Sequence, residues 1–108
     1  MEKRKPHYDL EQLKEFFCTE QTRRITEQAI TGATTLGYMI VEAMLDVIDQ
    51  LRSKHFYKSM TVYHNPQLWQ DVYKITDKDN DLYIKLQLDA DREKAVLVQF
   101  KRDEGGDL

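Results

Sequence analysis

The spacing of the apolar residues changes once along this chain, close to His55. Before this point, apolar residues recur every three or four positions, as in the stripe formed by Val41, Met44 and Ile48. That spacing places them on one face of a helix. After His55, apolar and polar residues alternate, which is typical of strands with one covered and one open face. A helical half followed by a strand half predicts an α+β domain.

Capping signals divide the first half into helices. Asp9 and Thr26 are expected N-caps, because their side chains can accept hydrogen bonds from the first helical N–H groups. Gly37 follows Leu36, the expected end of the second helix, and can adopt the left-handed conformation that ends a helix. We therefore expect helices over about residues 10–19, 27–36 and 41–51, with an extended segment or short strand at 21–25.

The second half predicts an antiparallel sheet of about four strands, with the helices packed on its apolar face. The strands are expected near residues 56–63, 69–76, 82–88 and 95–101, with turns at Asn65-Pro66, at 76–81 and at 89–93. The last two strands alternate most regularly. Side chains at every second position share a face, so the open face should carry Tyr83, Lys85, Gln87, Gln99 and Lys101. If Lys58 points to that face, Phe56 and Met60 should lie on it as well. If Gln70 points to it, so should Val72 and Lys74.

Length and charge limit the domain and its partners. The 108 residues fit one domain over residues 1–102, followed by an acidic tail at 103–108 that is expected to be disordered. The chain has 16 basic and 19 acidic residues, a balance that argues mildly against a nucleic-acid-binding protein. Asp103, Glu104 and Asp107 lie in the tail, so 16 acidic residues remain against 16 basic ones in the body, and a local basic patch is still possible.

Several kinds of site are not expected. Cys18 is the single cysteine, which excludes an internal disulfide, fits the reducing cytoplasm and is read as a half-buried thiol at a helix end. The three histidines lack zinc-ligand spacing, and Leu82 stands where a calcium loop beginning at Asp77 needs glycine. No apolar stretch is long enough for a transmembrane helix, and no signal peptide is evident. We therefore expect no metal, no cofactor and no membrane partner.

The open face of the predicted sheet has two interpretations. The simpler one is a solvated surface, because Lys, Gln and Tyr are common on exposed strands. The other is a surface that handles phosphate, since lysine ammonium groups stabilise charge on a phosphoryl transition state and tyrosine can transfer a proton. With no reactive cysteine or metal site expected, such a set suits RNA cleavage in which the 2′-hydroxyl is the nucleophile.

Four short segments resemble the MqsR family, the motility quorum-sensing regulator toxins. The resemblance extends over roughly residues 1–101 and includes the opening residues 1–4 with Pro6-His7. The segments are FYKSMT at residues 56–61, WQDVY at 69–73, Tyr83-Ile84-Lys85, and Val98-Gln99-Phe100-Lys101.

This resemblance implies a RelE-like fold and a specific activity. Members of the family are toxins of bacterial type II toxin–antitoxin systems. They act as metal-independent mRNA interferases, which cut single-stranded mRNA at short GC-containing sequences without a ribosome. The implied partner is an MqsA-like antitoxin, a zinc-containing helix-turn-helix protein, and contact with DNA is implied only through that antitoxin.

The resemblance also implies roles for individual residues. Lys58 and Lys101 would bind the scissile phosphate, Tyr83 would transfer a proton, and Gln70 would position the substrate. Met60 and Lys85 are expected to contact the substrate from the neighbouring positions. The expected products are a 2′,3′-cyclic phosphate and a 5′-hydroxyl. The competing hypothesis is a catalytically weak or inactive relative that uses the same face to bind or regulate a partner.

Overall fold

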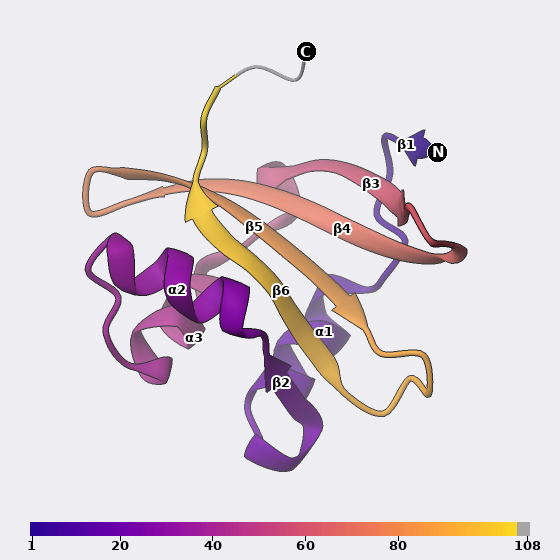
Figure 1. Cartoon of the computed structure of the whole chain (residues 1–108), viewed down its shortest axis with the longest axis horizontal. Coiled ribbons are helices and arrows are strands. Elements are labelled where there is room, and N and C mark those ends of the chain that lie inside the picture. The colour runs from indigo at the N-terminus through magenta and orange to yellow at the C-terminus, as the bar shows by residue number, and fades with distance from the viewer. Residues whose placement is uncertain (106–108) are drawn as a thin grey trace.

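The computed structural model describes residues 1–105 of the chain. Its helices are α1 (Leu10–Phe17), α2 (Glu27–Thr35) and α3 (Val41–Gln50), with short 3-10 helices η1 (Glu20–Thr22) and η2 (Ser53–His55). Its strands are β1 (Glu2–Lys3), β2 (Arg23–Ile25), β3 (Phe56–Val62), β4 (Asn65–Asp77), β5 (Asn80–Leu88) and β6 (Ala95–Arg102) (Figure 1). The predicted α+β class is confirmed. No helix within residues 1–105 is long and apolar enough to cross a membrane.

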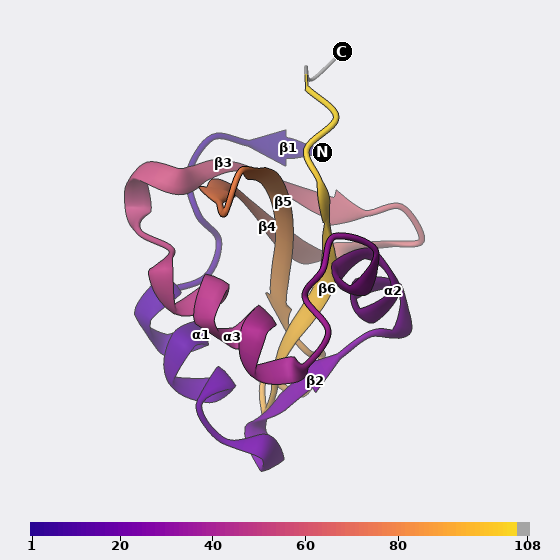
Figure 2. The ribbon, with the colours of Figure 1, turned by 90° about the vertical axis from the view of Figure 1, so that its left-hand side faces the viewer.

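The strands form one sheet in the order β1-β3-β4-β5-β6-β2. The four predicted strands are its centre, and each pairs antiparallel with its neighbour. A short edge strand is added on either side. β2 pairs parallel with β6, and β1 pairs antiparallel with β3 (Figure 2).

The expected helix ends are confirmed to within two residues. The carboxylate of Asp9 accepts hydrogen bonds from the backbone N–H groups of Glu11 and Gln12, and Thr26 Oγ1 accepts one from Ala29 N–H. Gly37 follows α2 with a φ of +96°, the left-handed region expected for it. Cys18 is the C-cap of α1, but it is exposed rather than half-buried.

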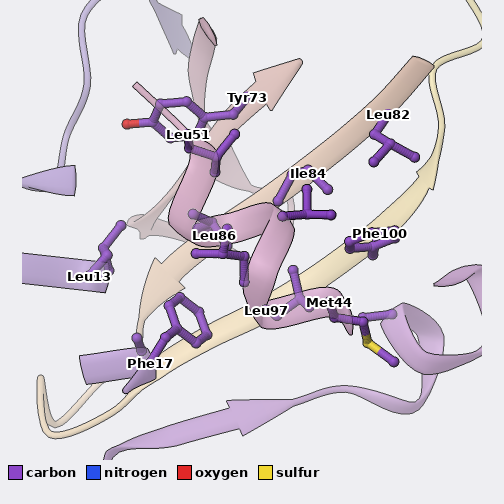
Figure 3. Close-up of a cluster of buried hydrophobic side chains, with 14 of the residues drawn as sticks. Leu13, Phe17, Met44, Leu51, Tyr73, Leu82, Ile84, Leu86, Leu97 and Phe100 are labelled. Atoms are coloured by element: carbon purple, nitrogen blue, oxygen red, sulfur yellow. The ribbon is translucent and has the colours of Figure 1, made fainter. Parts of the chain in front are cut away.

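The helices lie on one side of the twisted sheet, and the core fills the space between the two layers (Figures 1 and 2). Burial of these apolar side chains is the main force that holds the helices on the sheet. The cluster includes Leu13 and Phe17 of α1, Ala29 and Ala33 of α2, Met44 and Ile48 of α3, Tyr73 of β4, and Leu82, Ile84, Leu86, Leu97 and Phe100 of β5 and β6 (Figure 3). The opposite side of the sheet carries no helix within the described chain.

One expected turn is in a different place. Asn65 and Pro66 begin β4, and the chain reverses instead at Tyr63 and His64, because Val62 pairs with Asn65. The next turn lies where it was predicted. Asp77 pairs with Asn80, and Lys78 and Asp79 between them have φ of 49° and 68°, as a two-residue hairpin turn requires.

Candidate active site

The pairing of the strands brings the predicted site residues together on the face that the helices leave open. Lys74, Tyr83 and Lys101 are direct neighbours across β4, β5 and β6. The adjacent row runs from Lys58 through Val72 to Lys85. All of these positions belong to the alternating set opposite the core, so the predicted open face is confirmed for them.

Gln70 and Met60 extend this face towards the sheet edge. They are paired across β3 and β4. The side chain of Gln70 donates a hydrogen bond from Nε2 to Oε1 of Gln87, at 2.7 Å. This contact fixes the orientation of the Gln70 amide, so Gln70 lies in the same surface as the lysines.

A bulge in β3 changes one expected assignment. The register shifts between Phe56 and Lys58, so the two residues do not share a face. Phe56 instead packs against the core, with its ring 5.6 Å from that of Tyr73 in an edge-to-face contact. The prediction that Phe56 would accompany Lys58 was therefore wrong.

The same bulge adds Tyr57 to the site. Lys74 Nζ lies 3.9 Å from the centroid of the Tyr57 ring, and Lys58 Nζ lies 5.4 Å from it. The guanidinium carbon of Arg4 is 5.5 Å from the same centroid. Strict alternation from Lys58 assigns Tyr57 to the opposite face, so the sequence pattern gave no sign of this cluster.

The lysines of the open face are close enough to influence one another. Burial lowers the pKa of Lys85, and the positive charges of Lys101 and Lys58 lower it further. Lys101 Nζ lies 5.0 Å from the ring centroid of Tyr83, and Lys85 Nζ lies 5.9 Å from it. The site is thus a phenol bordered by cations, an arrangement suited to stabilising negative charge on a bound phosphate.

Val72 shows how tightly these side chains cover the sheet. It is fully buried but does not belong to the core cluster beneath the helices. Lys58 and Lys85 flank it in the same row. The side chains beside Val72 therefore shield it from solvent on the open face.

Carboxylates from the two ends of the described chain contact three of the lysines. Lys58 Nζ lies 2.8 Å from Glu2 Oε2, in an ion pair that links β3 to β1. Two further ion pairs join Lys74 to Asp103, at 3.3 Å, and Lys101 to Glu104, at 3.5 Å. These contacts were not predicted. Asp103, Glu104 and Gly105 of the expected tail are described, whereas 106–108 lie outside the described residues.

Metal binding has no candidate in this site. Across residues 1–105, no group of three or more His, Cys, Asp or Glu side chains is arranged to hold a metal ion.

Comparison of the sequence with known proteins identifies its family. The model of a family described as motility quorum-sensing regulator, toxin of MqsA, matches residues 5–102. The mRNA interferase toxin MqsR of Escherichia coli (strain K12) is 38% identical over 101 residues, which are 94% of this chain and 98% of that protein. The family resemblance of the sequence segments is confirmed by both matches. The chain belongs to the motility quorum-sensing regulator family of toxins.

Proposed function

We propose that this protein is the toxin of a type II toxin–antitoxin system and that it cleaves single-stranded mRNA. The observation that carries the proposal is the row of Lys74, Tyr83 and Lys101 on the uncovered face, with Lys85 beside it. Cations around a phenol provide both charge stabilisation and a group that can transfer a proton. The similarity to a named mRNA interferase over nearly the whole chain supports the same activity.

The proposed reaction needs no nucleophile from the protein. The 2′-oxygen of the RNA forms a bond to phosphorus, and the bond from phosphorus to the 5′-oxygen breaks. The 2′-hydroxyl loses a proton to a base, and the 5′-oxygen gains one. The products are a 2′,3′-cyclic phosphate and a 5′-hydroxyl, and no metal ion takes part.

Each residue of the site has a proposed role. Lys58 and Lys101 bind the scissile phosphate and offset the charge of its transition state. Tyr83 transfers a proton, which is consistent with its place among the cations. Gln70 positions the RNA through its oriented amide. Met60, next to Gln70, and Lys85, next to Tyr83, contact the substrate beside the scissile bond.

The biological setting follows from the family. The family is described as the toxin of MqsA, which implies an antitoxin partner, so the chain is expected to be held inactive by a cognate antitoxin. We propose that this partner is an MqsA-like helix-turn-helix protein, that DNA is contacted only through it, and that the toxin acts in the cytoplasm without a ribosome. Cleavage at short GC-containing sites is part of the same proposal.

The decisive experiment is cleavage of a defined single-stranded RNA by purified, antitoxin-free protein in EDTA at low salt. Cuts at a short recurring motif, with 2′,3′-cyclic phosphate ends, would establish the activity and its specificity. Intact RNA after incubation with correctly folded protein would instead favour the competing function, a non-catalytic relative that binds or regulates a partner through the same face.

A further inference from the structure

The N-terminal strand β1 is fixed along the edge of β3. Glu2 pairs with Met60, and Lys3 pairs with Ser59. The backbone N–H of Thr61 donates a hydrogen bond to the carbonyl oxygen of Met1, at 2.9 Å. These backbone contacts hold Glu2 beside the strand that carries Lys58, so the position of Glu2 does not depend on the ion pair alone.

The ion pair between Glu2 and Lys58 is unlike an ordinary surface pair. The Lys58 side chain is only 7% exposed, whereas that of Glu2 is 45% exposed. A buried ammonium group is costly without a nearby negative charge, so a carboxylate at 2.8 Å stabilises it strongly. The carboxylate presents an anionic oxygen to Lys58, as a phosphate of RNA would.

The other two ion pairs described on the open face are longer. Lys101 and Glu104 are 3.5 Å apart, and both side chains are well exposed. Water screens such a pair, which typically contributes little. The pair of Lys74 and Asp103 is longer than that of Lys58 and Glu2, at 3.3 Å. Among the described residues, Glu2 therefore makes the shortest of these three ion pairs, and it makes it with the most buried of the three lysines.

We infer that Glu2 sets the affinity of this protein for its substrate, because its carboxylate occupies on Lys58 the position that an RNA phosphate oxygen takes. This inference rests on the proposed function of the open face. A phosphate of the RNA must replace the Glu2 carboxylate on the Lys58 ammonium group before Lys58 can assist cleavage. Glu2 can leave without disrupting the core, because it belongs to a two-residue edge strand and is partly exposed.

The test compares binding of one RNA to matched variants. The probe is a single-stranded RNA with a sequence that the wild type cleaves. A 2′-O-methyl group at the scissile nucleotide removes the attacking hydroxyl, so the probe stays intact. Glu2→Gln should bind it about fivefold more tightly than the wild type at low salt, the effect of losing one competing ion pair. The gain should shrink as salt screens the charges. The purification tag belongs at the C-terminal end, so that residue 2 keeps its neighbours.

The matched control is Glu11→Gln. Glu11 forms an exposed ion pair with Lys14 on α1, at 3.7 Å, so this variant makes the same change in net charge away from the site. It should change affinity much less than Glu2→Gln does. Glu2→Asp keeps the charge but shortens the side chain by one methylene, and it should give an intermediate affinity.

Three outcomes would overturn the inference alone. The first is equal binding by Glu2→Gln and Glu11→Gln. The second is a gain from Glu2→Gln that persists in a Lys58→Gln background, since the exchange requires the ammonium group. The third is a fall in kcat with unchanged affinity, which would make Glu2 a proton acceptor instead. Wild-type cleavage is measured in parallel, and a wild type that neither binds nor cuts RNA would overturn the proposed function along with the inference.

Discussion

The Oδ2 atom of Asp71 accepts a hydrogen bond from the backbone N–H of Tyr8 at 2.9 Å, across 63 positions of the chain. The same carboxylate accepts the N–H of His7, at 3.0 Å from Oδ2, and the hydroxyl of Ser59, at 2.6 Å from Oδ1. Asp71 is fully buried at the centre of the sheet. It therefore ties the N-terminal segment to β3 and β4, and through that segment it helps to place Glu2.

Replacing Asp71 by Ala should destabilise the fold by about 3 kcal/mol, because two buried donors and one partly buried donor lose their acceptor. Denaturation by urea, followed by tryptophan fluorescence, measures this change. Asp91→Asn at an exposed position is the control and should change the free energy of unfolding by less than about 0.5 kcal/mol. Equal stability of the two variants would show that the carboxylate does not anchor the segment.

Removing the hydroxyl of Tyr73, in contrast to removing the carboxylate of Asp71, should not lower stability. Its hydroxyl is the buried side-chain polar atom for which the described chain provides no hydrogen-bond partner. Removing an unsatisfied buried hydroxyl is close to neutral or stabilising. Tyr73→Phe should therefore keep or raise the melting temperature.

Tyr8→Phe is the matched comparison for Tyr73→Phe. Tyr8 donates its hydroxyl to the carbonyl oxygen of Trp69, at 2.7 Å, and this loss should cost about 1 kcal/mol. A greater loss of stability in Tyr73→Phe than in Tyr8→Phe, in thermal unfolding, would contradict the assignment of Tyr73 as unsatisfied.

Gly32 is required by the close approach of α2 to β6. A Cβ atom at this position would lie only 2.2 Å from the backbone carbonyl oxygen of Phe100. Backbone cannot move as a flexible side chain does, so Gly32→Ala should cost about 2 kcal/mol despite the better helix propensity of alanine. Thr31→Ala, on the exposed side of the same helix, should be neutral or slightly stabilising in the same thermal unfolding experiment.

The features of the fold that follow from the spacing of apolar and polar residues could be predicted from the sequence. The helices, the four central strands and the shared face of Tyr83, Lys85 and Lys101 all follow from local spacing. The bulge at Tyr57 could not be predicted, because it arises from the pairing of β3 with β4 and leaves no mark on the alternation. The role of Asp71 could not be predicted either, because its partners are distant in the chain.

The candidate site residues were placed on one face partly by alternation, which assigned Tyr83 and Lys101 to the open face. The roles of Lys58, Gln70, Tyr83 and Lys101 came from the family resemblance, and the strand register explains why all four lie on the open face. Glu2 gave no signal, since a two-residue strand has no recognisable period. Its ion pair with Lys58 forms only because β1 pairs with β3 in the folded chain.

Lys85 should make stability depend on pH. Burial, then Lys101 and Lys58, lower its pKa in the folded state below the ordinary value of 10.5. Between the folded and unfolded pKa values the unfolded chain binds more protons, so stability rises with pH in that window. Below the folded pKa the full cost of burying the ammonium group is present.

Lys85→Gln should therefore raise the melting temperature at pH 7, and its advantage over the wild type should shrink as pH rises towards 10.5. Thermal unfolding at several pH values measures both effects. Lys94→Gln, at an exposed position, is the charge-matched control and should show no such trend. An advantage that grows with pH would mean that Lys85 is stabilised as a cation in the folded protein.

Tyr83→Phe should separate catalysis from folding. The change removes only the hydroxyl and leaves the ring that lies 5.0 Å from Lys101 Nζ. If the hydroxyl transfers a proton, cleavage of a defined RNA should fall by about 100-fold or more, while binding of the uncleavable RNA stays within about threefold. Tyr63→Phe, at a side chain that is 91% exposed, should cleave at the wild-type rate. Full activity of a folded Tyr83→Phe would transfer the proton step to another group of the face, and Lys85, whose pKa burial has lowered, is the first to test.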